Sequence, residues 1–402
     1  MKNKTVFYRS SSLILFLCFL LFFPLGAQGQ QNQRTQGISR QVIESSVQSE
    51  RHSFSLVRMV ENLDRPWAVG FLPDGTYLIT ERPGRLVLVN ATGRSIVQNT
   101  PEVAAVGQGG MLDLLIDPHF SQNQRIFFTF AQGTGNRLGL TVASAQLIVQ
   151  GQPSLRNLQI LWQTPSSALS GGGQHFGSRI VLDSDGYLYV TMGDRGTMER
   201  SQNPADPAGT ILRFQTNGTI PTTNPFVNRS TVNARGQSIS PLPEVFAYGT
   251  RNSQGMAIDW QGNIWFHEHG PRGGDELNLV VSGVNYGWPA VTHGVNYSGT
   301  RISALTSMDG VEDPHVVWTP SIAPSGFTFY SGSRFPGWNS SAFLGALAGQ
   351  HLRRLEFQQG RVVGQEVLFQ NTLGRIRDVR VSDQGFLYIL TDGPNGRLYR
   401  LE

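Results

Sequence analysis

From about residue 55 onward, the chain consists of short runs in which large apolar residues alternate with polar ones. Glycine, proline, asparagine and aspartate separate these runs, and no stretch after residue 30 keeps apolar residues at helical spacing for three turns. A period of two is typical of β-strands, because successive side chains point to opposite faces of a sheet. The pattern therefore predicts an all-β fold.

One short pattern recurs along the chain: a turn that contains glycine, followed by a strand of alternating large residues. Clear copies occupy residues 73–81, 183–191, 259–266 and 382–390, and looser copies occupy residues 117–130 and 335–347. Six repeats of this kind indicate a six-bladed β-propeller, in which each four-stranded blade buries its faces against its neighbours. A pair of two-sheet β-sandwiches is the alternative, but the number of repeats disfavours it.

The spacing of the repeats also predicts how the ring is organised. A strand around residues 55–60 is expected to complete the last blade beside residues 397–401 and so close the ring. The longer gaps near residues 200–240 and 290–320 are expected to be inserted loops.

The first 29 residues have the composition of a secretory signal peptide. Lys2, Lys4 and Arg9 form a basic start, residues 13–23 are apolar, and residues 27–29 supply small residues, Ala27 and Gly29, for cleavage. The apolar run is too short for a comfortable membrane span. We therefore expect a periplasmic or secreted protein, with no membrane span after the signal is removed.

Removal of this segment would change the chemistry that the chain can perform. Residues 30–50, rich in glutamine and serine, are expected to form a disordered linker, with the propeller in residues 51–402. The one cysteine, Cys18, and both lysines lie in the predicted signal, so the rest can form neither a disulfide nor a Schiff base. The formal charge falls from +4 to about +1, which argues against nucleic acid as a partner.

Five polar stretches together resemble the soluble PQQ-dependent sugar dehydrogenases, the family of glucose/sorbosone and aldose sugar dehydrogenases. These stretches are residues 107–113, 174–179, 248–255, 269–289 and 374–379. They occur in the family's order along nearly the whole chain. The resemblance implies a six-bladed propeller that oxidises an aldose at C1 to the lactone, with hydride transfer to PQQ assisted by Ca²⁺. An external electron acceptor would then reoxidise the cofactor.

His175 stands in a glycine-rich loop just before a predicted strand. Histidine is the usual general base near neutral pH, although a loop histidine that bonds only to backbone is the plainer interpretation. In the similar enzymes, the matching histidine takes the proton from the sugar hydroxyl. Gln174 stands beside it, where the glucose enzymes have a carboxylate that orients this histidine. Gln174 is expected to hold the imidazole less effectively and to contact the cofactor.

Arg251 and Asn252 lie in another glycine-flanked loop. A fixed guanidinium stabilises anionic oxygens through two hydrogen bonds, which suits a quinone that becomes anionic on reduction. An arginine that bonds only to turn carbonyls is the alternative. The resemblance assigns both residues to the reactive edge of the quinone, which gives Arg251 a catalytic role as well as a binding role.

Arg375 and Arg377 alternate along one predicted strand and so share a face. Two like charges side by side require an anion or solvent between them, and a solvated face is the alternative interpretation. In the similar enzymes, the matching pair binds the carboxylates of the cofactor. By the same resemblance, Gln108 would donate a further hydrogen bond to it.

A calcium site is expected in the loop that follows residue 269. The carbonyls of Gly270 and Pro271, in a loop without crowding side chains, suit a hard cation. The resemblance places there a calcium ion that polarises the carbonyl which accepts hydride. Glu276 and Tyr286 match a second, structural calcium site, with Asp275 nearby, although taken alone the two carboxylates would be surface residues.

The chain also departs from the family pattern. The glucose enzymes have a cofactor-binding lysine near the fifth blade, whereas residues 345–354 contain no lysine. Arg353 or Arg354 is the candidate to reach inward in its place. The inserted loops around residues 225–240 and 295–315 are expected to shape the sugar pocket.

Two other functions remain open from the sequence. The chain could be a propeller without redox activity that binds carbohydrate or protein, or a Ca²⁺-dependent lactonase. Lactonase chemistry usually requires several Asp, Asn or Glu side chains around the metal, whereas the candidate loop offers carbonyls and arginines. The choice of sugar and the natural electron acceptor are not predicted, and the protein is expected to be a monomer or a homodimer.

Overall fold

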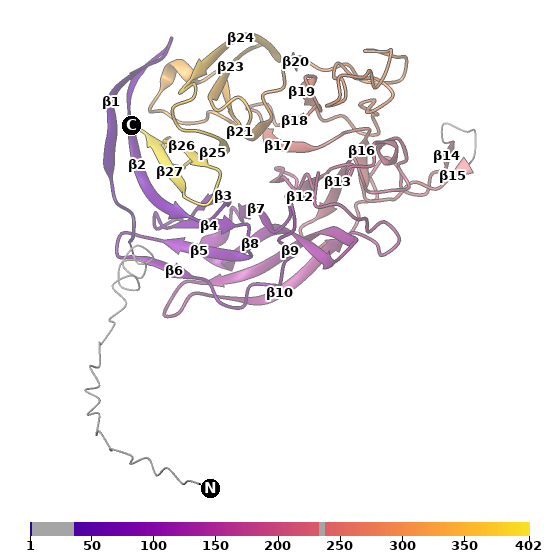
Figure 1. The fold of residues 1–402 in the computed structure, drawn as a ribbon. Helices are drawn as coiled ribbons and strands as arrows, with labels where there is room; N and C mark the ends of the chain where they lie inside the picture. The colour runs from indigo at the N-terminus through magenta and orange to yellow at the C-terminus, as the bar shows by residue number, and fades with distance from the viewer. Residues whose placement is uncertain (2–35, 233–237) are drawn as a thin grey trace.

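The computed structural model describes Met1 and residues 36–232 and 238–402. The rest of the predicted signal peptide and residues 30–35 of the predicted linker lie outside the described residues. The described chain forms six antiparallel sheets around a central axis, which confirms the predicted six-bladed β-propeller (Figure 1). None of the described helices is long and apolar enough to cross a bilayer.

Each blade contributes one inner strand, and neighbouring inner strands contact one another around the axis. The inner strands are β3 (Pro66–Phe71), β7 (Met111–Ile116), β11 (Ile180–Leu182), β17 (Ser253–Ile258), β21 (Pro324–Phe329) and β25 (Ile376–Val381). The second strands are β4 (Tyr77–Glu81), β8 (Arg125–Thr134), β12 (Tyr187–Met192), β18 (Ile264–Glu268), β22 (Ser341–Ala346) and β26 (Leu387–Thr391).

The third and outer strands lie progressively farther from the axis. The third strands are β5 (Arg85–Val89), β9 (Arg137–Ile148), β13 (Thr210–Gln215), β19 (Asp275–Leu279), β23 (Leu352–Gln358) and β27 (Gly396–Leu401). The outer strands are β6 (Arg94–Ile96), β10 (Ser154–Gln163), β16 (Val245–Tyr248), β20 (Val316–Trp318), β24 (Arg361–Leu368) and β2 (Ser53–Leu63). Smaller elements are the hairpin β14 (Thr231–Val232)–β15 (Ser238–Ile239), helix α2 (Phe120–Asn123), and the 3-10 helices η1 (Met198–Gln202) and η2 (Pro336–Trp338).

The six sequence repeats mark the second strand of each blade. Each repeat covers the turn after an inner strand and the strand that follows it. In the four clear repeats the turn glycine has a positive φ, between 76° at Gly385 and 87° at Gly262. Glycine adopts this backbone conformation without the strain that a Cβ atom would cause, which explains why the turn residue recurs.

Strand β2, near the N-terminal end of the described chain, closes the ring, as predicted. It pairs antiparallel with β27 at the opposite end of the described chain, with Leu56 opposite Leu401 and Val57 opposite Arg400 (Figure 1). Blade six therefore contains segments from both ends of the chain, so the ring closes through backbone hydrogen bonds as well as through side-chain packing.

A further strand, β1 (Gln41–Gln48), pairs with β2 and lies within the residues predicted to be a disordered linker. The linker prediction is therefore wrong for these residues. Only Val47 of this strand is buried. The edge of β2 offers unpaired N–H and C=O groups, and a segment containing β-branched residues can pair with them without burying much side-chain area.

Hydrophobic clusters follow one another around the ring. One cluster spans blades one to three, and four further clusters join blades three and four, four and five, five and six, and six and one. The core therefore lies between the faces of neighbouring blades, as the sequence analysis expected.

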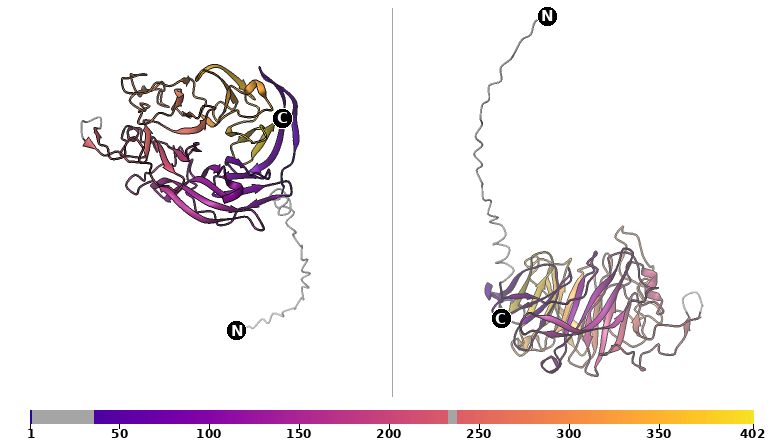
Figure 2. Two further views of the ribbon diagram at one scale, coloured as in Figure 1. Left: turned by 180° about the vertical axis from the view of Figure 1, so that it is seen from behind. Right: turned by 90° about the horizontal axis from the view of Figure 1, so that it is seen from below.

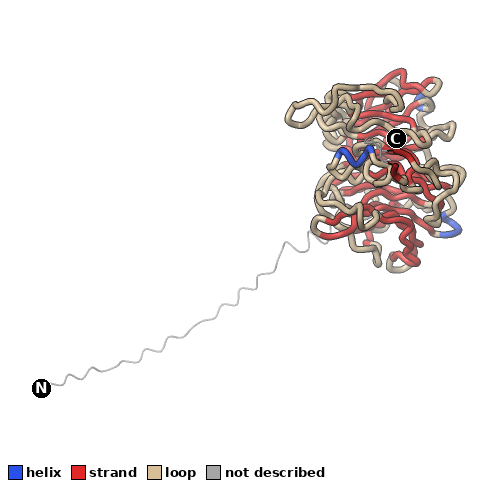
Figure 3. Tube along the Cα trace, turned by 90° about the vertical axis from the view of Figure 1, so that its right-hand side faces the viewer, coloured by secondary structure: helices blue, strands red, loops and turns tan. Residues whose placement is uncertain are grey.

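The antiparallel course of each blade brings two sets of loops to the same face of the ring. These are the loops that precede the inner strands and the loops between second and third strands, because both leave the same end of the sheet. We call this face the upper face. The right-hand view of Figure 2 and Figure 3 show the ring edge-on, with loops at both ends of the strands.

Candidate active site

A cavity of about 260 Å³ lies at the centre of the ring and is lined by residues of all six blades. Every lining residue lies either on an inner strand or in a loop of the upper face. The lining residues are Trp67, Arg82, Gln108, Leu112, Phe176, Gly177, Ser178, Asn252, Gln254, His269, Ala323, Leu347, Arg375, Arg377 and Asp392. Four of the predicted cofactor-binding residues, Gln108, Asn252, Arg375 and Arg377, thus meet at one cavity.

The charges that line this cavity are mainly positive. Arg82, Arg375 and Arg377 contribute guanidinium groups, whereas Asp392 is the one carboxylate among the lining residues. Because a half-buried cavity screens charge less than water does, this imbalance favours an anionic ligand.

Asp392 lies between the two arginines that were predicted to share a face. Its Oδ2 atom is 3.2 Å from Nε of Arg375 and 3.5 Å from Nη2 of Arg377. Burial works to raise the pKa of Asp392, but the two guanidinium charges hold it below its usual value. The anion expected between Arg375 and Arg377 is therefore supplied, at least in part, by the protein itself.

Arg377 retains an unused donor. Its Nη1 donates to Oε1 of Gln254 at 2.9 Å, and its guanidinium lies 5.7 Å from the ring centre of Trp67. Its buried Nε has no hydrogen-bond partner among the described residues. Burial lowers the pKa of Arg377, and the charge of Arg179 adds to the effect. A buried guanidinium with a free N–H beside an aromatic ring suits a flat, anionic ligand.

A buried ion-pair network links the inner strands next to the cavity. Nη1 of Arg179 lies 3.0 Å from Oδ1 of Asp113 and 2.9 Å from Oδ1 of Asp378. Arg380 contacts the same two carboxylates at 2.6 and 2.9 Å. Arg179 also donates from Nε to the carbonyl of Gln254 at 2.8 Å. The network is balanced in charge and connects blades two, three and six to the cavity residue Gln254.

His175 is oriented by a carboxylate that the sequence analysis did not single out. Its Nδ1 donates to Oδ1 of Asp194 at 2.6 Å, and Oδ2 of Asp194 accepts from Nε1 of Trp288 at 2.9 Å. Burial works to raise the pKa of Asp194, but the hydrogen bond and charge of His175 hold it below its usual value. Asp194 therefore stays ionised near neutral pH, and Nε2 of His175 is left as the basic nitrogen.

The backbone of His175 is held as well as its ring. Its N–H donates to Oε1 of the cavity residue Gln108 at 2.8 Å, and the next three residues line the cavity. Gln174 does not orient the imidazole and is not among the lining residues; its carbonyl accepts from Arg195. The prediction that Gln174 holds the ring is therefore wrong, because Asp194 occupies the hydrogen-bonding position at Nδ1.

Arg251 lies just outside the cavity lining. Its Nη1 donates to the carbonyls of His269 at 2.9 Å and Gly270 at 3.3 Å, and its backbone N–H donates to Glu268. Arg251 therefore makes the contacts of the alternative interpretation, in which its guanidinium bonds to turn carbonyls. Its guanidinium also lies 5.4 Å from the ring of Trp288, which bonds to Asp194.

His269 is a neutral imidazole in the middle of the site. Its Nε2 donates to the carbonyl of Pro324 at 2.6 Å. Burial lowers the pKa of His269 to about 3, and the charges of Arg251, Arg377 and His175 contribute in the same direction. Arg251 also donates to the carbonyl of His269, and His269 and Arg377 line the same cavity.

A second, very small cavity, of about 10 Å³, lies beside the predicted calcium loop. Glu268, Gly270, Glu276 and Tyr286 are among its lining residues, and the two glutamates stand opposite each other on paired strands. Burial raises the pKa of Glu276 to about 7, and burial together with the charge of Glu276 raises that of Glu268. Arg251 also lines this cavity, but no described cationic side chain forms an ion pair with either carboxylate, so a cation would stabilise the pair.

Asp275, another predicted metal ligand, has protein partners. Asp275 accepts hydrogen bonds from Gly270, Ser321 and the N–H groups of Ile322 and Ala323, between 2.6 and 2.8 Å. Neither it nor Pro271 lines the small cavity. Over residues 36–232 and 238–402, no three His, Cys, Asp or Glu side chains are grouped to hold a metal. A metal here would therefore rely on carbonyl oxygens as well as the two glutamates.

The proposed substitutes for the family's lysine face away from the axis. On the third strand of blade five, Arg353 bonds to Gln365 at 2.8 Å, and Arg354 bonds to Glu366 and Glu50 at 2.7 Å each. The prediction that either arginine reaches inward is wrong, because outer carboxylate and amide groups hold them. The described residues of the loops around 225–240 and 295–315 are not among the lining residues of the central cavity, although Val295 pairs with Arg272 next to the predicted calcium loop.

Several site residues escaped the sequence analysis, but they share a signal. Arg82, Asp194 and Asp392 directly follow, or lie within two residues of, the end of a second strand. Since the repeats mark these strands, polar residues that come just after each repeat must lie on the upper face. Glu268, the last residue of β18, follows the same rule.

Known proteins similar to this chain include sugar dehydrogenases. The sequence profile described as Glucose / Sorbosone dehydrogenase matches residues 63–400. The chain is 36% identical to the aldose sugar dehydrogenase YliI of Escherichia coli (strain K12), over 85% of this chain and 91% of that protein. It is 25% identical to the quinoprotein glucose dehydrogenase B of Acinetobacter calcoaceticus, over 83% and 84% of the two chains.

A solved structure shares the whole architecture. The soluble aldose sugar dehydrogenase from Escherichia coli, in its apo-form, superposes with a TM-score of 0.80 and 32% sequence identity. The match covers 91% of this chain and 99% of that one. The fold of this chain is therefore similar, over most of its length, to that of a solved aldose sugar dehydrogenase.

Proposed function

Because the chain belongs to the glucose/sorbosone dehydrogenase family, we propose that it oxidises an aldose at C1 to the lactone, with PQQ as the hydride acceptor. The observation that carries the proposal is the central cavity, where three guanidinium groups and the aromatic side chains of Trp67 and Phe176 surround a space with a single carboxylate. A flat cofactor with several carboxylates has the charge and shape for such a space.

The cofactor would be held by groups from several blades. Arg377 and Arg375 offer N–H donors to carboxylates, Gln108 and Asn252 offer amides, and Trp67 offers a face for a planar ring system. Bound PQQ would supply the carbonyl that accepts the hydride. Since the lining residues lie on six separate blades, the closed ring fixes their positions before the cofactor arrives.

His175 is the proposed base. The reaction removes the hydrogen of C1 with its electron pair and the proton of the C1 hydroxyl, and Nε2 of His175 accepts that proton. Asp194 holds the imidazole through Nδ1 and stabilises the imidazolium that forms. Trp288 in turn fixes the carboxylate of Asp194.

Calcium is proposed as a second component. Glu268 and Glu276, with the carbonyl of Gly270 beside them, are the groups that would hold it. The ion would supply positive charge, which neutralises the two buried carboxylates and adds to the field that stabilises developing anions. Arg251 already donates to the Gly270 carbonyl, so this guanidinium and the ion would act on the same loop.

The basic and apolar start of the chain supports the proposal that the protein is exported, to the periplasm or beyond the cell. Expression of the full chain in a bacterium, followed by cell fractionation, tests this proposal. We expect a product shortened at or near residue 29 in the periplasm or medium, and a full-length cytoplasmic product would contradict it.

A reconstitution experiment tests the proposed reaction. Protein produced without PQQ is titrated with PQQ and Ca²⁺, and an aldose and a dye acceptor are then added. We expect dye reduction that requires PQQ and that falls by about 10²–10⁴-fold in His175→Ala, as for loss of a general base. His119→Ala, which removes an exposed histidine far from the cavity, is the matched control and should keep full activity.

The same experiment distinguishes the other functions. Ester hydrolysis that needs Ca²⁺ but not PQQ would identify a lactonase instead. Binding of sugar or protein without turnover, in the presence of PQQ and Ca²⁺, would identify a binding propeller. Either result would overturn the proposed dehydrogenase activity.

A further inference from the structure

Arg82 lines the central cavity from the loop between β4 and β5, a position that the sequence analysis did not single out. Its backbone is fixed on both sides, since its N–H donates to the carbonyl of Arg65 at 3.0 Å and its carbonyl accepts from Met111 at 3.1 Å. Its guanidinium donates from Nε to the carbonyl of Gly109 at 3.1 Å and from Nη2 to that of Gly107. The side chain is therefore held in place by neutral acceptors.

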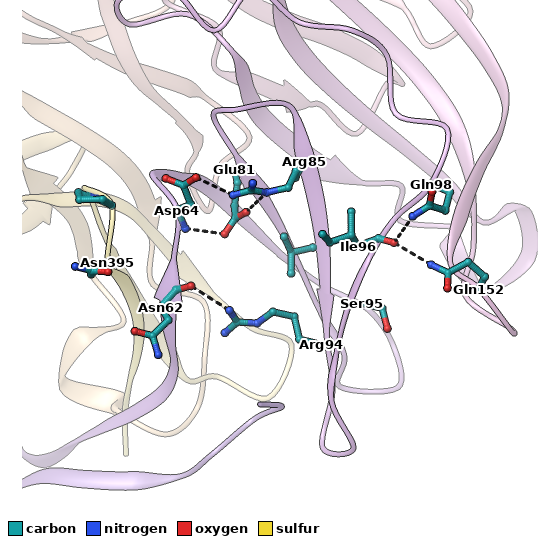
Figure 4. Close-up of a pocket in the computed structure, with 12 residues that line it drawn as sticks. Asn62, Asp64, Glu81, Arg85, Arg94, Ser95, Ile96, Gln98, Gln152 and Asn395 are labelled. Carbon is teal, nitrogen blue, oxygen red and sulfur yellow. Dashed lines mark hydrogen bonds and ion pairs between the residues drawn. The ribbon is translucent and has the colours of Figure 1, made fainter. Parts of the chain in front are cut away.

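Two carboxylates close to the β4–β5 loop, Glu81 and Asp64, are engaged elsewhere. Glu81 and Asp64 both pair with Arg85, at 2.7 and 2.8 Å, in a separate outer cavity of about 580 Å³ (Figure 4). The β4–β5 loop thus directs Glu81 and Arg85 outward and Arg82 toward the axis.

Arg82 consequently has no carboxylate within ion-pair distance in the part of the chain that the structure describes. Burial lowers the pKa of Arg82, and Asp392 opposes this effect only from beyond contact distance. Asp392 is itself shared between Arg375 and Arg377. The positive charge of Arg82 is therefore left without a counter-ion at the cavity wall, which is an unfavourable arrangement unless an anion binds there.

We infer that Arg82 is a cofactor-binding residue, whose guanidinium contacts a carboxylate of the bound PQQ from blade one. The inference rests on the proposed function. Arg82 would supply a cation for the cofactor at a part of the cavity wall where no protein carboxylate pairs with it. The chain has no lysine after Lys4 that could do so. With Arg82 included, the lining groups carry two more positive than negative formal charges, which suits a ligand with at least two carboxylates.

The same contacts connect Arg82 to the proposed base. The carbonyls that it caps flank Gln108, and the amide of Gln108 accepts from the backbone of His175 at 2.8 Å. A carboxylate bound at Arg82 would therefore be fixed to the loop that also fixes His175. This link adds a positioning role, which must be separated from binding by experiment.

Direct titration of PQQ into the protein in Ca²⁺-containing buffer tests the inference. The quenching of tryptophan fluorescence is a suitable signal, since Trp67 lines the cavity, and calorimetry provides an independent Kd. We expect Arg82→Gln to raise the Kd by about 10- to 100-fold, as for one hydrogen bond to a charged group. Arg82→Lys should give a smaller increase of several-fold, because it keeps the charge but loses the fork of donors.

Arg65→Gln is the matched control. Arg65 lies in the neighbouring loop and its side chain is 50% exposed, paired with Asp64 at 2.8 Å. The Kd of Arg65→Gln for PQQ should stay within about twofold of the wild-type value, since an exposed ion pair contributes little to stability or binding. A rise of ionic strength should also weaken PQQ binding less in Arg82→Gln than in the wild type, because one ionic contact is missing.

The outcomes separate the inference from the function on which it rests. A wild-type protein that does not bind PQQ overturns the proposed function. A wild-type protein that binds PQQ, with an unchanged Kd but a lower kcat in Arg82→Gln, overturns only the inference and leaves Arg82 as a positioning residue. If Arg82→Gln does not fold, Arg82→Lys decides, and a Kd within twofold of the wild type would overturn the binding role.

Discussion

At the scale of single residues, the contacts of His175 hold the imidazole that we propose as the base, although this residue lies in a glycine-rich loop. Its φ of 53° is in the left-handed region, which few residues other than glycine adopt readily. The hydrogen bonds that its backbone N–H donates to Gln108 and its ring donates to Asp194 hold it in this conformation. Strain of this kind persists only where the surroundings determine the conformation, which is common at functional sites.

The role of Asp194 leads to a first prediction. Asp194→Asn should lower kcat by about 10²–10⁴-fold, because the amide neither fixes the productive tautomer of His175 nor stabilises its cation. The Kd for PQQ should change little, since Asp194 does not line the cavity. Steady-state kinetics and a PQQ titration measure the two effects. Asp185→Asn, at an exposed turn, is the control and should leave both values unchanged.

The two buried glutamates lead to a second prediction, on pH. Burial raises the pKa of Glu276 from 4.5 to about 7, so the folded protein binds this proton more tightly than the unfolded chain does. Without a metal, the free energy of unfolding should therefore fall as the pH rises from about 4.5 to 7. Denaturant titrations in EDTA between pH 5 and 8 would measure the slope, which Glu276→Gln should flatten.

Calcium should reverse this trend. Since the ion requires ionised carboxylates, the stabilisation by added Ca²⁺ should increase as the pH rises through about 7. Thermal melts with and without Ca²⁺ at pH 6 and 8 would detect the change. Equal shifts at both pH values, or the same shift in Glu276→Gln, would argue against a metal at these residues.

At the scale of secondary structure, the ends of the strands decide what enters the site. The inner strands supply Trp67, Gln254 and Arg377, and the turns after second strands supply Arg82 and Asp392. Third strands direct their charged groups elsewhere, as Arg353 and Arg354 show. The position of a residue within its blade, rather than its chemical type, therefore determines whether it reaches the cavity.

The network between inner strands leads to a third prediction. Asp113→Asn would leave Arg179 and Arg380 buried with one carboxylate, Asp378, between them. The free energy of unfolding should fall by about 3–5 kcal/mol, as for a buried pair that loses one partner. Chemical denaturation measures the loss, and Asp383→Asn, at an exposed turn, should change it by less than about 0.5 kcal/mol.

On the scale of the whole molecule, the ring depends on pairing between its two ends. Strand β2 supplies the outer edge of blade six, and its buried residues Leu56, Val57, Met59, Val60 and Leu63 pack in the clusters that join this blade to its neighbours. The closed ring holds six loop systems in fixed relation around the cavity. Closure is therefore a condition for the site as well as for stability.

Two truncations test this dependence. A chain that begins at Ser49 lacks β1, of which only Val47 is buried, and should fold with a small loss in Tm. A chain that begins after Leu63 also lacks β2, whose buried side chains each contribute about 1.5–3 kcal/mol, and should not form a stable ring. Thermal melts and PQQ titrations distinguish the two. Stable, PQQ-binding protein without β2 would contradict the role of closure.

The sequence by itself determined the repeating unit and hence the architecture. Alternation of apolar residues and the recurring turn glycine are local properties, so they identified the second strand of all six blades and the closing strand near residues 55–60. The loop motifs likewise indicated the family and brought Gln108, Asn252, Arg375 and Arg377 together correctly. The strand β1 was missed because its few apolar residues bury little area.

Only the tertiary structure decided which polar groups face each other. The pairing of His175 with Asp194, the outward course of Arg354 and the exposure of Arg82 to the axis all depend on how separate blades are arranged around the ring. A sequence records the type and order of side chains, whereas the distance between two charges on different blades is set by closure. The electrostatics of the site, which depend on such distances, therefore arise only when the ring has formed.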